Sequence, residues 1–180
     1  DHADIFDDLA SIERQFHHLV RIVPKSGRVV ANGADEHVKR VLTMGCWSSV
    51  DAFGIADGWQ AGEPDGDGAF EVLFAGQSMG RVRWSLLGLH NRLNALATLA
   101  AARHVGIEPA AGIEALRTFG GVRRRMQERG KASGVTVYDD FAHHPTAIRT
   151  TLEGLRQRVG KARILAVLEP RSNTMKRGIM

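Results

Sequence analysis

The chain has 180 residues, of which 43% are hydrophobic and 24% charged, with one cysteine and no apolar run near the roughly 20 residues that span a bilayer. These numbers exclude a peptide-sized module, an internal disulfide framework and a membrane span; because the N-terminus also shows no basic start followed by an apolar core, we expect a cytoplasmic globular protein. The net charge of +4 is unevenly distributed along the chain. Residues 1–76 carry 6 Lys/Arg and 13 Asp/Glu, a net charge of −7, and residues 77–180 carry 18 Lys/Arg and 7 Asp/Glu, a net charge of +11. The second part is therefore either a solvated basic surface or one that attracts a nucleotide, a phosphorylated metabolite or nucleic acid.

The first part of the chain alternates helix and strand patterns. Apolar residues recur at three- and four-residue spacing before Pro24, which predicts an amphipathic helix with the face Ile5, Leu9, Ile12, Phe16, Leu19 and Val20. Residues 27–42 predict a short strand and a helix, and residues 44–54 predict another strand. Such alternation is typical of an α/β layer. Residues 57–68, "DGWQAGEPDGDG", are rich in Gly, Asp and Pro and are predicted to be loop.

The second part begins with a predicted hairpin. Residues 69–88 contain two β-like runs around Gly76 to Gly80. The Ala and Leu content of residues 89–107 predicts a strong helix, and a second helix is expected at about 109–119. The basic connector "GGVRRRMQERGKASG" then marks a domain boundary. Beyond it the patterns predict a βαβ unit: a strand at 135–140, a helix at 145–159 and a buried strand at 162–170.

The loop "DDFAHHP" follows the first strand of that unit and gathers several groups with chemical potential. Ligands bind at the carboxyl ends of strands in such units, where helix N-termini present unpaired N–H groups to anions, and Pro145 suits the first helical turn. Asp140 could accept hydrogen bonds from ribose hydroxyls, and His143 and His144 could donate to an oxyanion or move a proton. Alternatively, Asp140 caps the turn and both histidines are merely exposed. A zinc site is disfavoured because no third ligand lies nearby.

Two further groups of residues could contact a nucleotide. Asn91 and Asn94 in "GLHNRLNAL" are three residues apart at a helix start and so share a face; an amide matches the adenine edge, although capping of the helix is an equal alternative. The run "RRR" at 123–125 could grip phosphate and stabilise charge that develops in phosphoryl transfer. Phosphate of RNA would serve equally well, but aromatic residues for base stacking are scarce after Phe119, which disfavours nucleic acid.

The order of these motifs resembles the ATP-dependent Mur ligase family. The resemblance rests on "DH.D" at the start, "G.HN..NALA" in the middle, "F.G...RR" in the connector and "DD.AHHPTA" after the next strand, and it covers nearly the whole chain. It implies an α/β fold in which the latter part of a central ATPase domain precedes the first βαβ part of a Rossmann-like C-terminal domain. The expected boundaries are 1–122 for the central domain, 123–132 for a linker and 133–180 for the C-terminal domain. The family's phosphate-binding glycine loop has no match in the chain, so these 180 residues are expected not to hydrolyse ATP by themselves.

The resemblance also implies roles for individual residues. His2 matches a histidine that helps to hold Mg²⁺ near the γ-phosphate of ATP. Asn91 and Asn94 match the pair that contacts adenine. Arg125 matches the connector arginine that reaches the γ-phosphate, with Arg124 as the alternative counterpart.

The C-terminal loops complete the expected site. Asp140 matches the aspartate that binds the ATP ribose across the domain cleft, and His143 and His144 would face the reacting centre or the incoming amine. Arg171 and Ser172, in "PRSNTM", are candidates for recognising the amine substrate, because the alanine-adding relative carries a "PHRYTR"-like loop there. Several relatives also carry a carbamoylated lysine about one helix after the metal histidine, whereas this chain has "RQFHHLV", which leaves the second metal's ligands open.

Within the family, "YDDFAHHPTAI" with "LEPRSNTMK" is similar to the members that join the tripeptide L-Ala-γ-D-Glu-meso-diaminopimelate to UDP-N-acetylmuramate in peptidoglycan recycling. The expected chemistry needs ATP and Mg²⁺ and proceeds through an acyl phosphate. The nearest alternative is addition of L-alanine to the same UDP-sugar. Alternatives from other classes are a non-catalytic nucleic-acid-binding module on the basic half, and an interaction fragment that binds no nucleotide. Neither a nucleic acid nor a membrane is an expected partner.

Overall fold

The computed structural model describes residues 5–169, which form two compact units. The first unit comprises residues 5–84 and Arg92–Thr118, and the second comprises Ser85–Asn91 and residues 119–169. His2, Arg171 and Ser172 lie outside the described residues. None of the helices in the described part of the chain is both long and apolar enough to cross a membrane.

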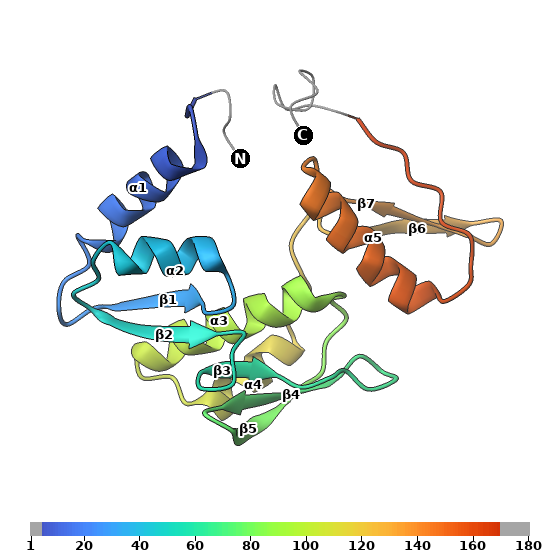
Figure 1. Cartoon of the computed structure of the whole chain (residues 1–180). Helices are drawn as coiled ribbons and strands as arrows, with labels where there is room; N and C mark the ends of the chain where they lie inside the picture. Colours follow the sequence, from blue (N-terminus) through green and yellow to red (C-terminus); the bar gives the residue numbers. More distant parts are fainter. Residues whose placement is uncertain (1–4, 170–180) are drawn as a thin grey trace. The chain divides into compact units, whose positions relative to one another are not determined.

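The first unit is built on a mixed five-stranded sheet in the order β1-β2-β3-β4-β5 (Figure 1). The first two connections place strands in parallel, and the last two are antiparallel. The strands are β1 (Arg28–Asn32), β2 (Ser49–Phe53), β3 (Trp59–Ala61), β4 (Phe70–Phe74) and β5 (Gln77–Val82). The predicted strands at the start of the chain and the hairpin at 69–88 are therefore confirmed.

Four helices accompany this sheet: α1 (Leu9–Val20), α2 (Glu36–Thr43), α3 (Leu89–His104) and α4 (Pro109–Arg117). The side chain of Asp8 accepts a hydrogen bond from the Ser11 backbone N–H at 2.7 Å and so begins α1. Asp35 begins α2 in the same way. The predicted helices in this part of the chain are confirmed, and α1 begins later than the apolar spacing suggests because Asp8 is its cap.

The hydrophobic core of the first unit lies where α3 and α4 meet the antiparallel strands. Its fully buried large side chains are Trp59, Phe70, Val72, Val82, Leu96 and Leu99. On α3, the buried Ala95, Leu96, Leu99 and Ala100 recur at helical spacing, so this face packs against the sheet. The core therefore fixes the body of α3, whose first turn carries Asn91.

The prediction of loop for residues 57–68 was wrong at Trp59–Ala61, which form β3. Trp59 pairs with Phe74 on β4, and the two ring centroids lie 5.0 Å apart. The Gly, Asp and Pro residues around this strand outnumber its three residues, so composition alone favoured loop. Pairing on both sides and the complete burial of Trp59 stabilise the strand.

The second unit contains a two-stranded antiparallel sheet, β6 (Gln127–Ala132) and β7 (Val135–Asp139), and the helix α5 (Pro145–Val159). Ser133 and Gly134 join the strands with positive φ of 48° and 80°, as a tight hairpin turn requires. Strand β7 and helix α5 confirm the predictions for 135–140 and 145–159. The connector was predicted without a strand, but its polar residues from Gln127 form β6 because the hairpin turn returns them onto β7.

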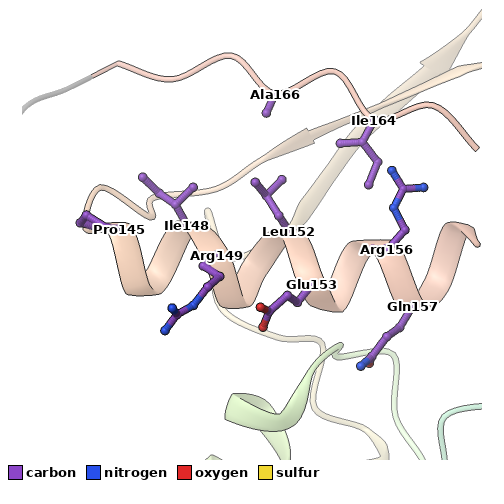
Figure 2. A pocket seen from close by; sticks show the side chains of 9 residues that line it. All are labelled: Pro145, Ile148, Arg149, Leu152, Glu153, Arg156, Gln157, Ile164 and Ala166. Carbon is purple, nitrogen blue, oxygen red and sulfur yellow. The ribbon is translucent and has the colours of Figure 1, made fainter.

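The buried strand predicted at 162–170 is not formed in the described part, which ends at Glu169. Residues 162–169 pair with no described strand, and Leu165 and Val167 remain 78% and 89% exposed. The apolar residues therefore lack the neighbouring strand that would bury them. Figure 2 shows Ile148 and Leu152 of α5 pointing toward Ile164 and Ala166 of this segment. These residues help to line an open hollow of about 940 Å³.

Candidate functional site

Asp140, directly after β7, is held in a fixed orientation by the backbone. Its Oδ2 accepts a hydrogen bond from the Met126 N–H at 2.7 Å, and its Oδ1 accepts one from the Ala142 N–H at 2.7 Å. The alternative that Asp140 caps the turn is therefore present in the structure. These two hydrogen bonds leave the carboxylate able to accept more, because its two oxygens together offer about four acceptor positions. A half-buried carboxylate with a fixed direction and spare acceptors suits a hydroxyl-bearing ligand.

The two arginines of the connector differ in their partners. Arg124 Nε lies 3.5 Å from Asp139 Oδ2, and its guanidinium carbon lies 5.1 Å from the Phe141 ring centroid. Its carbonyl also accepts a hydrogen bond from the Phe141 N–H at 2.8 Å. Arg125 is exposed and makes no ion pair within residues 5–169. Because Arg124 is engaged and Arg125 is not, the geometry favours Arg125 as the group available to a phosphate.

The two histidines of the loop have local structural contacts. Nδ1 of His143 lies 3.0 Å from the Phe141 carbonyl oxygen, and the two rings meet edge to face with centroids 5.1 Å apart. His144 begins α5, and its Nδ1 accepts a hydrogen bond from the Thr146 N–H at 3.3 Å. His143 is exposed and His144 is half-buried. A role for either in catalysis stays a prediction, and the exposed His143 is the freer of the two to meet a substrate.

The two asparagines lie near the start of α3 but differ in their surroundings. Asn91 is half-buried and donates a hydrogen bond from Nδ2 to the Leu87 carbonyl oxygen at 2.7 Å. This bond fixes its amide and leaves Oδ1 as an acceptor. Asn94 is exposed one turn later on the same helix. Their contact with adenine stays a prediction.

His90 is a candidate that the sequence interpretation missed. It lies in the second unit with Arg125 and Asp140, and its buried Nδ1 has no hydrogen-bond partner among the described residues. Burial lowers the pKa of His90 below its ordinary value of 6.5; the carboxylate of Asp140 opposes this shift, and the charge of Arg125 adds to it. The only signal in the sequence is its place before Asn91 in "GLHN", which is weak because nothing there indicates burial.

Together, Asn91, Arg125, Asp140 and both loop histidines lie in the second unit. A fixed carboxylate and an unpaired guanidinium can bind a ribose hydroxyl and a phosphate, respectively. Within the described residues, no group of three or more His, Cys, Asp and Glu side chains could hold a metal ion. The predicted metal residue His2 lies outside residues 5–169, so no metal site can be assembled from the described chain.

Comparison with known proteins identifies the family of this chain. The Mur ligase middle domain model matches residues 1–102, and the Mur ligase glutamate ligase domain model matches residues 124–180. The chain is 57% identical over 181 residues to the UDP-N-acetylmuramate–L-alanyl-γ-D-glutamyl-meso-2,6-diaminoheptandioate ligase of Escherichia coli (strain K12), covering 99% of this chain and 40% of the relative. It is 33% identical over 186 residues to the UDP-N-acetylmuramate–L-alanine ligase of Caldanaerobacter subterraneus subsp. tengcongensis, covering 100% of this chain and 40% of that relative.

A solved structure is similar as well. The UDP-N-acetylmuramate:L-alanyl-γ-D-glutamyl-meso-diaminopimelate ligase from Neisseria meningitides aligns with a TM-score of 0.66 and 53% identity, covering 69% of this chain and 38% of that one. The chain thus spans about 40% of the length of the curated relatives it matches. With both family models matching in chain order and an α/β structure to support them, the chain belongs to the Mur ligase family.

Proposed function

We propose that this chain is part of an ATP-dependent ligase that joins the tripeptide L-Ala-γ-D-Glu-meso-diaminopimelate to UDP-N-acetylmuramate. The observation that carries the proposal is that one unit contains both the Asp140 carboxylate, which two backbone N–H groups orient, and the Arg125 guanidinium, which makes no ion pair among the described residues. The same unit also holds Asn91. The relative that is 57% identical bears the name of this activity, which supports the choice of substrate. We assign the reaction to peptidoglycan recycling and to the cytoplasm, where ATP and UDP-sugars are available.

The proposed reaction transfers the γ-phosphoryl group of ATP to the lactyl carboxylate of UDP-N-acetylmuramate. The amino group of the tripeptide then attacks the acyl phosphate, so that an amide forms and phosphate leaves. Both steps develop negative charge on oxygen, which a positioned arginine opposes. Arg125 is suited to this role because no carboxylate within residues 5–169 neutralises it.

The other residues would position the nucleotide. Asp140 would accept hydrogen bonds from the ribose hydroxyls, since two backbone N–H groups already set its direction. Asn91 and Asn94 would contact adenine, and His143 and His144 would face the reacting centre. Mg²⁺ would neutralise charge on the phosphates, with His2 as the residue proposed to help to hold it. Arg171 and Ser172 are proposed to recognise the amine substrate.

We also propose the division of the chain at 1–122, 123–132 and 133–180. The connector supports this proposal because Arg124 and Met126 adopt positive φ of 60° and 48°, a backbone path uncommon for residues other than glycine. Positive φ at two of three successive residues is typical of a turn between folded parts rather than of a regular element. Limited proteolysis of the full-length protein tests it, and the first cut should fall within residues 123–126, before β6 begins at Gln127.

The test of the proposed function uses the full-length protein with ATP, Mg²⁺ and UDP-N-acetylmuramate, and measures phosphate release. We expect release with the tripeptide and little with L-alanine. Release with L-alanine alone would move the assignment to the alanine-adding reaction. If no nucleotide binds, the chain is an interaction fragment, and if random oligonucleotides bind with an affinity that falls steeply with salt, it is a nucleic-acid-binding module.

A further inference from the structure

His90 is a half-buried titratable group of the second unit, and the proposed mechanism leaves it unused. Its ring packs over Gly88: a methyl group added to Gly88 would lie 3.0 Å from both Cε1 and Nδ1 of His90. Gly88 has φ of +84° and also lies against Gly154 of α5, where an added methyl group would come within 3.3 Å of the Gly88 Cα. The imidazole therefore occupies the space beside the Gly88 backbone, and this packing holds the side of the ring that carries Nδ1.

We propose that His90 is a further nucleotide-binding residue, whose Nε2–H donates a hydrogen bond to an oxygen of the nucleotide held by Arg125 and Asp140. This inference rests on the proposed function and adds a residue to its site. The ligand oxygen belongs to either the ribose or a phosphate, which share the chemistry of a hydrogen-bond acceptor.

The tautomer follows from the burial of Nδ1. Nδ1 is shielded from solvent and has no hydrogen-bond partner in the described part of the chain. A buried N–H without an acceptor is the rarer and costlier arrangement, so the proton resides on Nε2. Nε2 makes no hydrogen bond within residues 5–169 and does not share the burial of Nδ1. A donor with no protein partner at the edge of a ligand site is free for the ligand.

The charges around the ring support the same role. Asp140 and Arg125 both lie near enough to shift the pKa of His90, yet they form no ion pair with each other among the described residues. Both charges thus act on the imidazole, in opposite directions, without forming an ion pair with one another. Burial keeps the imidazole uncharged at neutral pH, so it adds a donor beside Arg125 without a second positive charge.

The experiment measures ATP affinity by calorimetry for the full-length wild type and for His90→Phe, His90→Gln and the control His104→Phe. His104 is an exposed histidine in the last turn of α3, so its change should leave affinity within about twofold. Removing the donor should weaken ATP binding about tenfold in His90→Phe. Glutamine places an N–H close to the position of Nε2, so His90→Gln should recover most of that loss. Parallel titrations with adenosine and inorganic triphosphate show whether the oxygen is on the ribose or the phosphates.

The pH dependence separates binding from a structural role. Once the pH falls below 6.5 and the imidazole gains a proton, its Nε2–H becomes a charged donor, so His90 should add to the affinity for the anionic nucleotide in the wild type; His90→Phe should lack that contribution. Protonation of ATP itself is common to both proteins, so their difference isolates His90. In ¹⁵N-histidine-labelled wild type, the His90 ring signals should titrate below pH 6.5 and shift when ATP binds, a readout that needs no variant to fold.

The outcomes distinguish this inference from the proposed function. A wild type that binds no ATP overturns both. A wild type that binds ATP, together with a folded His90→Phe protein of unchanged affinity and pH profile, overturns the role of His90 alone. Ring signals of His90 that do not respond to ATP overturn it as well.

Discussion

The backbone N–H of Met126 donates a hydrogen bond to the Asp140 carboxylate at 2.7 Å, which ties the connector to the loop after β7. Arg125 immediately precedes Met126, so the residue proposed to meet phosphate and the residue proposed to meet ribose are held by one contact. The bond makes Asp140 both a structural and a binding residue. Its substitution should therefore affect more than one measurable property.

Replacing Asp140 with alanine should weaken ATP binding by about 10- to 100-fold, because a hydrogen bond to a charged group is lost and two backbone donors lose their acceptor. Calorimetry with the full-length protein measures this. The neighbouring Asp139→Asn is the matched control, since its carboxylate makes an exposed ion pair with Arg124 and should matter less than about fivefold. Equal effects of the two changes would contradict the assignment of Asp140.

Arg125→Lys should lower kcat by about 100-fold, because lysine cannot present the planar pair of donors that arginine offers to a transferring phosphoryl group. The control is Arg124→Lys. In the wild type the Arg124 guanidinium lies against Phe141 and Asp139, so this change should affect folding stability more than turnover. Steady-state kinetics at saturating ATP make the comparison. A larger loss of kcat in Arg124→Lys would exchange the roles of the two residues.

Glu13 should make the free energy of unfolding of the first unit depend on pH in the acid range. Its side chain is only 8% exposed, and Arg40 Nη2 and His37 Nδ1 lie 2.7 and 3.0 Å from its Oε1. The hydrogen bond from Arg40, followed by that from His37, lowers the pKa of Glu13 below its ordinary value of 4.5. Because the folded pKa is lower than the unfolded one, the stabilisation is fully present above pH 4.5 and is lost as the pH falls toward the folded pKa.

Thermal unfolding between pH 3 and 7 tests this dependence. Glu13→Gln should lower the melting temperature at pH 7 and flatten its decline in acid. Glu36→Gln is the control, because Glu36 is 71% exposed and forms its ion pair with Lys39 of the same helix. An equal fall of melting temperature in acid for wild type and Glu13→Gln would show that other carboxylates cause the effect.

Gly154→Ala should destabilise the protein although alanine favours helix by about 1 kcal/mol. The added methyl group would lie 3.3 Å from backbone atoms of Gly88, which cannot rotate away, and overpacking of this kind costs about 1–3 kcal/mol. The expected net loss is about 1 kcal/mol. Gln157→Ala, on the exposed side of the same helix, should change the melting temperature little. An increase in stability for Gly154→Ala would show that Gly88 can yield.

Much of this fold could be predicted because its signals are local. Pro145 marks the first turn of α5, and the Ala and Leu content of residues 89–107 indicated α3. Strands β3 and β6 were missed because their composition is typical of loops, and only their pairing with neighbouring strands stabilises them as strands. The strand expected at 162–170 shows the converse, since apolar sequence forms no strand where no described neighbour pairs with it.

The candidate residues could be named from the sequence, but their different surroundings could not. The sequence places Arg124 and Arg125 side by side, and only the contacts with Phe141 and Asp139 tell them apart. His90 could not be singled out, because the burial of Nδ1 depends on its packing over Gly88, which the sequence does not reveal.

The most direct test of the central claim is a competition between the two amine substrates. The full-length protein is given ATP, Mg²⁺ and UDP-N-acetylmuramate with equal concentrations of the tripeptide and L-alanine, and the products are separated by mass. The account predicts that the UDP-N-acetylmuramoyl tripeptide dominates and that its formation requires ATP. A product that contains only alanine, or amide formation without ATP, would contradict it.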